Sequence, residues 1–215
     1  MLSLARPYLV VHTWSPLGMK HIIRQYALEQ GALEVQYIEE NFSEFQNKKS
    51  ADEILERLED RECLVLLSMA APPDDEDALI PVAFKVGHEI KQFETQSKLV
   101  DLVSQLSGCV QLTDRKVFYS WIGGTRRGWR GAGHYRALTE QQEEWAHQRG
   151  YHEIVVKTKN KFYSMRKTLD HMQFNVVKFQ PDLTESRESK LYMSKRIGAE
   201  LRRTPDTGQS LEDSL

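Results

Sequence analysis

A small basic turn at residues 130–133, Arg-Gly-Ala-Gly, is the part of the sequence best suited to bind a ligand. It lies between an apolar, strand-like run that ends near Gly124 and a helix-like run that begins near His134. Glycine and alanine let a ligand approach the backbone closely, and the N–H groups at a helix N-terminus attract anions. This order of elements therefore predicts a binding site for phosphate or pyrophosphate.

Positive charge gathers around this turn. Residues 125–136 contain four arginines and no acidic residue, although the whole chain has a formal net charge of -2 and a pI near 6.4. A nucleic-acid-binding domain usually has a strongly basic balance, so we expect no nucleic-acid partner. The local charge would instead meet a further phosphate or steer an anionic ligand. The four residues are Arg126, Arg127, Arg130 and Arg136.

Other phosphate-binding turns fit the sequence poorly. A P-loop requires a lysine and a hydroxyl residue after its last glycine, and neither follows Gly133. A dinucleotide-binding turn requires a third glycine, but Arg136 stands at that position. Two alternatives stay open: an unrelated nucleotide-binding domain, and a glycine turn that serves only tight packing between a strand and a helix.

Residues 125–138, TRRGWRGAGHYRAL, resemble motif A of the GNAT acyltransferase superfamily, whose pattern is Arg/Gln-x-x-Gly-x-Gly/Ala. Arg130 takes the first position and Gly133 the fourth, while Tyr135 stands where the family has glycine or alanine. The resemblance covers residues 80–180 through its motifs, and the earlier part of the chain only through the order of elements.

A second motif follows in the expected order. The strand-like run ending at Asn160, followed by a helix-like run with Met165 and then by Phe174, resembles the next motif of the family. In that family the pantetheine arm of CoA lies along the strand before the glycine turn, and the asparagine contacts the same arm. A helix N-cap is the alternative role for Asn160.

The resemblance implies acetyl-CoA as co-substrate and an amine as acceptor, with no metal. The residues that it assigns to acetyl-CoA are Ile122, Gly123, Gly124, Thr125, Arg130, Gly131, Ala132, Gly133, His134, Tyr135 and Asn160.

Acyl transfer to an amine needs a deprotonated amine, a stabilised oxyanion and a proton for the leaving thiolate. Many GNAT enzymes supply that proton from a tyrosine at the position that Leu169 occupies here. Tyr163, at the start of the same helix, is the candidate acid, with a half-buried packing role as the alternative. Glu89 is the candidate base, with His88 beside it, and a solvated or structural role is the alternative for both. Water could also carry the proton, with the enzyme acting mainly by positioning.

The function predicted from these residues is an N-acetyltransferase that moves an acetyl group from acetyl-CoA to a primary amine by direct attack in a ternary complex. The alternative is a non-catalytic, acyl-CoA-binding module of the GNAT fold that regulates or scaffolds. The sequence identifies neither the acceptor nor the oligomeric state. It is compatible with a homodimer.

The elements that must position these residues predict an α/β (α+β) fold. We expect a single GNAT-like domain over residues 1–202, with a mixed, mostly antiparallel sheet of six to seven strands flanked by helices, and a disordered tail over residues 203–215. Residues 33–38 fit a strand or a helix. The expected strands are 8–13, 63–69, 80–86, 117–122, 154–157, 174–179 and an edge strand at 191–197. The expected helices are 19–27 closed by Gly31, one capped by Ser50 and Glu53, a short one at 99–106, 134–148 and 161–172.

Composition indicates a globular protein in a reducing compartment. Cys63 and Cys109 have apolar neighbours and no CxxC spacing, so we expect buried free thiols. No apolar run approaches the ~20 residues of a membrane span, and the N-terminal stretch lacks the apolar core of a secretory signal. These features favour a cytoplasmic protein with no membrane partner.

Overall fold

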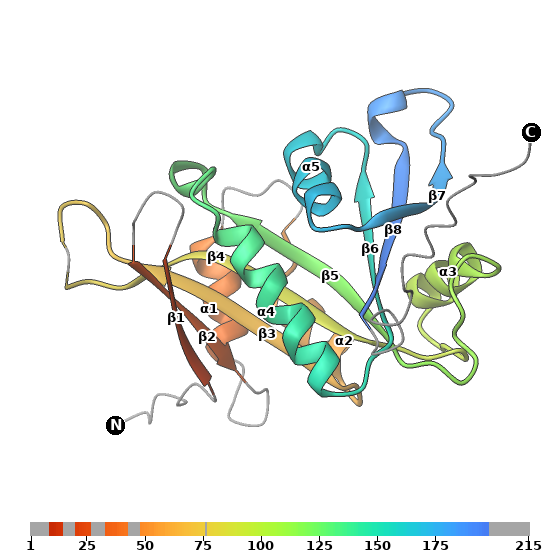
Figure 1. Ribbon diagram of the computed structural model, residues 1–215, viewed down its shortest axis with the longest axis horizontal. Coiled ribbons are helices and arrows are strands. Elements are labelled where there is room, and N and C mark those ends of the chain that lie inside the picture. Colours follow the sequence, from red (N-terminus) through yellow and green to blue (C-terminus); the bar gives the residue numbers. More distant parts are fainter. Residues whose placement is uncertain (1–8, 15–19, 27–32, 43–47, 76, 198–215) are drawn as a thin grey trace, which may run out of the picture.

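One eight-stranded sheet dominates the computed structural model, which describes residues 9–14, 20–26, 33–42, 48–75 and 77–197 (Figure 1). Within those residues the strand order is β1-β2-β3-β4-β5-β6-β8-β7, and β5 and β6 form the parallel pair in an otherwise antiparallel sheet. The predicted mixed, mostly antiparallel α/β fold is confirmed. The strands are β1 Leu9–Trp14, β2 Lys20–Tyr26, β3 Cys63–Ala70, β4 Ile80–Ile90, β5 Val117–Thr125, β6 Glu153–Lys159, β7 Asn175–Gln180 and β8 Lys190–Arg196.

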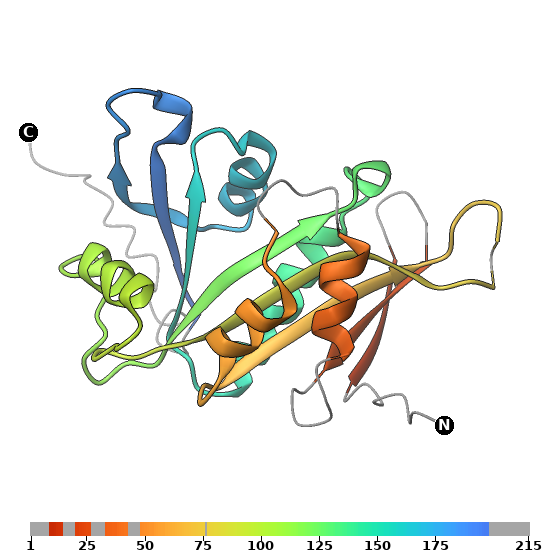
Figure 2. The same ribbon diagram turned by 180° about the vertical axis from the view of Figure 1, so that it is seen from behind.

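Helices cover both faces of this sheet (Figures 1 and 2). On one face α4 crosses β3, β4 and β5, and the apolar side chains beneath it join those of α5 in one core cluster. On the other face α1 and α2 pack over β3 and β4, and α3 packs against a separate cluster around β5, β6 and β8. The helices are α1 Leu33–Asn41, α2 Ala51–Leu58, α3 Ser97–Leu106, α4 His134–Gln148 and α5 Tyr163–His171, with 3₁₀ turns at Arg127–Trp129 and Ser186–Glu188.

Strands β5 and β6 pair only at their beginnings. The ladder joins residues 117–120 of β5 to residues 153–156 of β6 and then ends, and beyond it the two strands diverge (Figure 1). A β-bulge lies on the other side of β5, because Val86 pairs with Ile122 while Gly87 pairs with Ser120. Trp121 is therefore the extra residue, and the bulge bends β5 where it leaves β6.

The expected helix over residues 19–27 is wrong for its described part, which is strand β2. Ile22, Ile23 and Tyr26 fit a helical spacing, but burial alternates along the segment: His21 and Ile23 are buried, while Ile22 and Arg24 are half-buried. β2 pairs with β1 on one side and β3 on the other, and these ladders override the local pattern. This strand brings the sheet to eight strands, above the expected six to seven. Gly31 lies outside the described residues.

The segment expected as an edge strand is also placed differently. β8 lies between β6 and β7, and its residues from Leu191 to Ser194 are buried. Lys195, which suggested a solvent-facing edge, instead forms an ion pair with Glu143 of α4, with Nζ and Oε2 2.6 Å apart. The edge strand at this end of the sheet is β7, where Val176 and Phe179 are exposed.

Local signals predicted the other helices. The capping box is confirmed: the Glu53 N–H donates to Ser50 Oγ and the Ser50 N–H donates to Glu53 Oε2, both at 3.1 Å. Residues 33–38, left open between strand and helix, belong to helix α1. The short amphipathic helix is α3, which buries Leu99, Leu102 and Leu106.

The two cysteines form no disulfide, as expected, but they are not both buried. Cys63 is half-buried and Cys109 is exposed, because Cys109 follows the end of α3 on a surface turn. Among the described residues, no helix is long and apolar enough to cross a membrane. The expected tail at 203–215 lies outside the described residues.

Candidate functional site

The glycine turn forms the N-terminus of α4. Gly131 has φ +86° and Gly133 has φ +88°, values in the left-handed region that glycine adopts without strain. Gly133 is the N-cap of α4 and provides no side-chain cap. The first N–H groups of this 15-residue helix therefore donate to no N-cap side chain, which leaves a geometry suited to an anion.

The arginines around the turn have different surroundings. Arg130 Nε donates to the carbonyl oxygen of Thr125 at 3.1 Å, which ties the turn to the end of β5. The N–H of Arg126 donates to Val82 O at 2.9 Å and extends the β4–β5 pairing by one residue. Arg136 is exposed and forms an i,i+4 ion pair with Glu140, with Nε and Oε1 2.7 Å apart. Arg130 is thus the arginine most closely integrated into the turn.

The other residues assigned to the cofactor around the turn face the core. Ala132 and His134 are buried, and His134 Nδ1 lies 3.0 Å from Ser68 Oγ of β3. Burial lowers the pKa of His134 to about 4, so the ring is neutral at physiological pH. The ring of Tyr135, which departs from the motif, packs 4.2 Å from Lys85 Nζ beneath α4. Its side chain therefore points to the sheet.

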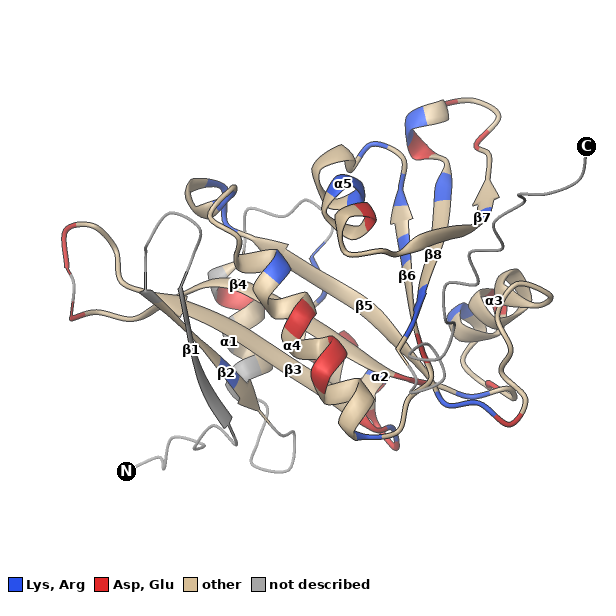
Figure 3. Ribbon diagram, viewed as in Figure 1, with Lys and Arg blue, Asp and Glu red and all other residues tan. Residues whose placement is uncertain are grey.

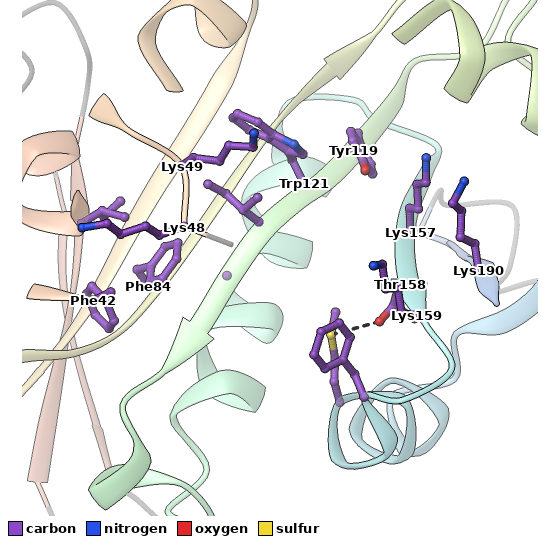
Figure 4. Close-up of a pocket in the computed structure, with 15 residues that line it drawn as sticks. Phe42, Lys48, Lys49, Phe84, Tyr119, Trp121, Lys157, Thr158, Lys159 and Lys190 are labelled. Carbon is purple, nitrogen blue, oxygen red and sulfur yellow. Dashed lines mark hydrogen bonds between the residues drawn. The ribbon is translucent and has the colours of Figure 1, made fainter. Parts of the chain in front are cut away.

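A cavity of about 340 Å³ opens where β5 and β6 diverge (Figure 4). Ile122 and Gly123, both predicted to contact the cofactor, line it. The predicted Gly124 and Thr125 continue β5 beyond the cavity toward the glycine turn. The divergent strands thus connect the cavity to the N-terminus of α4. Other lining residues are Phe42, Phe84, Tyr119, Trp121, Thr158, Phe162, Met165 and the lysines at positions 48, 49, 157, 159 and 190.

A second cavity of about 320 Å³ adjoins the first on the side of α2 and α3. The two cavities share Tyr119, Trp121 and Lys157 in their walls. We call the two together the groove. Within the described residues no cluster of His, Cys, Asp or Glu could hold a metal ion. The residues that line only the second cavity are Arg57, Ser97, Lys98, Asp101 and Leu102.

Asn160 lies just after β6 and is already engaged by the protein. Its Nδ2 donates to Ser186 O at 3.1 Å, and its Oδ1 accepts from Arg166. The alternative role of a helix N-cap is wrong, because α5 has Phe162 at that position. In this structure the Asn160 side chain holds the β7–β8 connection against the end of β6.

The structure does not bring the predicted acid and base together. Tyr163 is 59% exposed at the start of α5, outside the groove lining, although its neighbour Phe162 lines the first cavity. Glu89 lies near the far end of β4, where its Oε1 is 3.2 Å from Lys91 Nζ. His88 is fully buried, and burial lowers its pKa to about 4. Leu169 is buried in the core and has no access to the groove.

Sequence reasoning missed Tyr119 as a functional candidate. Its side chain lines both cavities and is only 6% exposed. Burial raises the pKa of the Tyr119 hydroxyl above its usual value, so the group stays protonated. The sequence placed Tyr119 in a strand, but the face on which it lies depends on pairing partners far along the chain. The alternating lysines at 157 and 159 were also a readable signal of a charged strand face.

Comparison with known proteins identifies the fold: the chain has the fold of the GNAT acetyltransferases. The *Escherichia coli* ribosomal-protein-S18-alanine N-acetyltransferase matches with a TM-score of 0.54 at 13% identity, over 90% of this chain and 99% of that one. *Arabidopsis thaliana* NAA60 in complex with acetyl-CoA matches with a TM-score of 0.56 at 10% identity, over 82% and 98%. A chain of the NatC complex bound to Gag peptide and CoA matches with a TM-score of 0.56 at 12% identity, over 82% and 98%. No protein-family model matches the sequence, and no curated protein does.

Proposed function

We propose that this protein is an N-acetyltransferase that transfers the acetyl group of acetyl-CoA to a primary amine by direct attack in a ternary complex. One observation carries the proposal: the β5–β6 ladder ends after four pairs, and the free part of β5 leads to a helix N-terminus with two left-handed glycines. A cofactor with an extended arm and a pyrophosphate needs a strand edge and an anion site in that order.

The residues at this edge fit such a cofactor. In our proposal the pantetheine arm lies along residues 122–125, and the pyrophosphate meets the N–H groups from Gly131 onward, with Arg130 adding a charge-assisted contact. A Cβ built on Gly131 would meet no protein atom within 4 Å, so the backbone there is open to a ligand. Asn160 stays a proposed contact to the arm, and it would have to share its side chain with Ser186 and Arg166.

For this reaction the protein has to position the two substrates, stabilise the oxyanion and supply one proton to the leaving thiolate. Acetyl-CoA supplies the thioester, whose C–S bond breaks as the amine nitrogen forms the new amide bond. Backbone N–H groups near Ile122 and Gly123 are the proposed donors to the oxyanion. Tyr119 is the proposed acid for the leaving thiolate, because the residue lines the groove and its hydroxyl stays protonated. Tyr163 is the rival acid from the sequence, and water is the proposed carrier of the amine's proton.

Similar structures support the two kinds of substrate. NAA60 was solved with acetyl-CoA, and the NatC complex with CoA and a Gag peptide. In our proposal this chain likewise binds an acyl donor and an amine acceptor, and neither a metal nor a nucleic acid takes part.

Calorimetry followed by turnover tests the proposal. We expect acetyl-CoA to bind, 3′-dephospho-CoA to bind more weakly, and ATP and NAD not to bind. Absence of acetyl-CoA binding at millimolar concentration would overturn the proposal. Release of CoA thiol across a panel of amines then measures turnover. Binding without release from any amine would favour the alternative, a non-catalytic acyl-CoA-binding module.

A further inference from the structure

Basic residues dominate the walls of the groove. Among its lining residues seven are basic and one, Asp101, is acidic. They come from segments far apart in the sequence: the connection between α1 and α2, helices α2 and α3, and strands β6 and β8. Figure 4 shows Lys48 and Lys49 on one side of β5, and the lysines of β6 and β8 on the other. The full basic set is Lys48, Lys49, Arg57, Lys98, Lys157, Lys159 and Lys190.

Three of these lysines crowd one face of the sheet. Lys157 and Lys159 alternate along β6 and share a face, and Lys190 of β8 pairs directly opposite Lys159. Like charges directly opposite each other destabilise a sheet. Burial lowers the pKa of Lys157, an effect that Asp101 opposes and the charge of Lys190 adds to. An anion lying between the lysines would relieve this repulsion.

Acidic residues nearby neutralise the cluster only in part. Lys159 shares Glu188 with Lys161, so one carboxylate faces two ammonium groups. Lys157 lies 3.7 Å from Asp101, whose side chain is itself about half exposed. The floor between the lysines is apolar, formed by Phe84 and Trp121. Low-dielectric walls focus the field of the lysines into the groove.

The groove lysines lie on a different face of the sheet from the glycine turn. The turn lies at the N-terminus of α4, which covers one face of the sheet, whereas the lysines accompany α1, α2 and α3 on the other (Figures 1 and 2). Each face therefore has its own group of positive charges. If the group at the turn meets the phosphates of the donor, the second group is left for the acceptor.

Resting on the proposed function, we propose that the acceptor is the amino terminus of a peptide with acidic side chains in the residues that follow it. The amine would reach the divergence of β5 and β6, and the carboxylates would meet the lysines of β6 and β8. Two adjoining cavities of about 340 and 320 Å³ lie within the range of ~300–1,000 Å³ for ligand pockets, and none of the residues proposed to contact the pantetheine arm lines the second one.

Three tetrapeptides of one length test the charge preference: Ala-Asp-Glu-Phe, its neutral counterpart Ala-Asn-Gln-Phe, and Ala-Lys-Lys-Phe. We expect kcat/KM for the acidic peptide to exceed that for the neutral peptide about tenfold at low salt, with a smaller ratio at 0.5 M NaCl because salt screens the lysines. Equal kcat/KM for the three peptides would overturn the inference while leaving the acetyltransferase proposal intact. Free glutamate used as well as the acidic peptide would overturn the assignment to a peptide.

A charge reversal locates the preference. Lys190→Glu places a carboxylate opposite Lys159, an arrangement that the sheet tolerates, and should abolish the preference for the acidic peptide. Lys167→Glu is the matched control, because Lys167 is exposed on α5 and lines neither cavity. It should leave the ratio unchanged. If Lys190→Glu raised the KM of acetyl-CoA instead of that of the peptide, the lysines would serve the donor, and the inference would be wrong.

Discussion

The two faces of the sheet treat lysine in opposite ways. Beneath α4, Lys85 is 1% exposed; its Nζ donates to Thr139 Oγ1 at 2.8 Å and lies over the ring of Tyr135. Burial lowers the pKa of Lys85 to about 7. On the other face, lysines line the two cavities of the groove. Figure 3 marks the basic positions along β6 and β8 in blue.

Lysines on one face are part of the packing, whereas lysines on the other face are accessible to a ligand. Lys85 is enclosed by protein atoms and carries only part of its charge at physiological pH, so it presents no ammonium group at the surface. The groove lysines keep contact with solvent and present their charge to whatever enters. The same residue type therefore supports the packing of α4 on one face and, in our proposal, selects the acceptor on the other.

The largest expected effect is on kcat, and it tests which face of the sheet supplies the proton for the leaving thiolate. Tyr119 belongs to the groove face, whereas Tyr163 begins α5, which packs into the α4-face core. Tyr119→Phe should lower kcat about 100-fold, within the usual range for general acid catalysis, and leave the affinity for acetyl-CoA unchanged. Tyr163→Phe should change kcat by less than about twofold. Steady-state kinetics with one amine measures both, and the reverse ranking would return the role of acid to Tyr163.

The next effect concerns the buried lysine. The unfolded chain holds the Lys85 proton up to a pKa of about 10.4, whereas the folded pKa is about 7, so the unfolded state binds more protons between those values. The free energy of unfolding should therefore rise with pH, by about 2 kcal/mol from pH 7 to pH 9, and the penalty should be fully present below pH 7.

Lys85→Met should remove that rise, which urea unfolding at several pH values measures. The substitution is tolerable because Thr139 Oγ1 still donates to Tyr135 O. Lys167→Met, on the exposed side of α5, is the matched control and should keep the wild-type slope. An unchanged slope in Lys85→Met would mean that Lys85 is solvated, and the contrast between the two faces would lose its basis.

The smallest effect compares the two ends of α4. Gly131 and Gly150 both have positive φ, and a Cβ on either would meet no atom within 4 Å. Gly131→Val and Gly150→Val should therefore lower the unfolding free energy alike, by about 1–3 kcal/mol of backbone strain. Only Gly131→Val should weaken acetyl-CoA binding, by about tenfold in calorimetry. Equal affinities in the two variants would exclude this turn as the phosphate site.

The sequence predicted features that neighbouring residues determine. Short-range geometry determines the capping box at Ser50, the buried run of β3 and the glycine turn. A few neighbouring residues are therefore enough to predict each of them. Strand β2 was misread because its apolar positions fit both a helical and a strand period. The interior position of β8 was misread because strand order depends on pairing across the whole chain.

The same distinction between short-range and long-range determinants applies to the candidate site. The donor side was predicted from one continuous stretch, because the strand, turn and helix follow one another directly. The groove could not be predicted, since Lys48, Lys157 and Lys190 are brought together only by the sheet. Tyr119 was overlooked for a related reason: the bulge at Trp121 sets which side chains of β5 face the cavity, and it arises from pairing with β4.

The four-pair joint between β5 and β6 has a mechanical consequence. It joins a five-stranded part of the sheet to a three-stranded part, and among the described residues the β5–β6 ladder does not continue beyond Ser120. A molecule seated in that gap takes the place of the missing ladder and binds the halves to each other. Cohesion of the sheet and occupancy of the site are then coupled, because a ligand that binds only the folded state stabilises it.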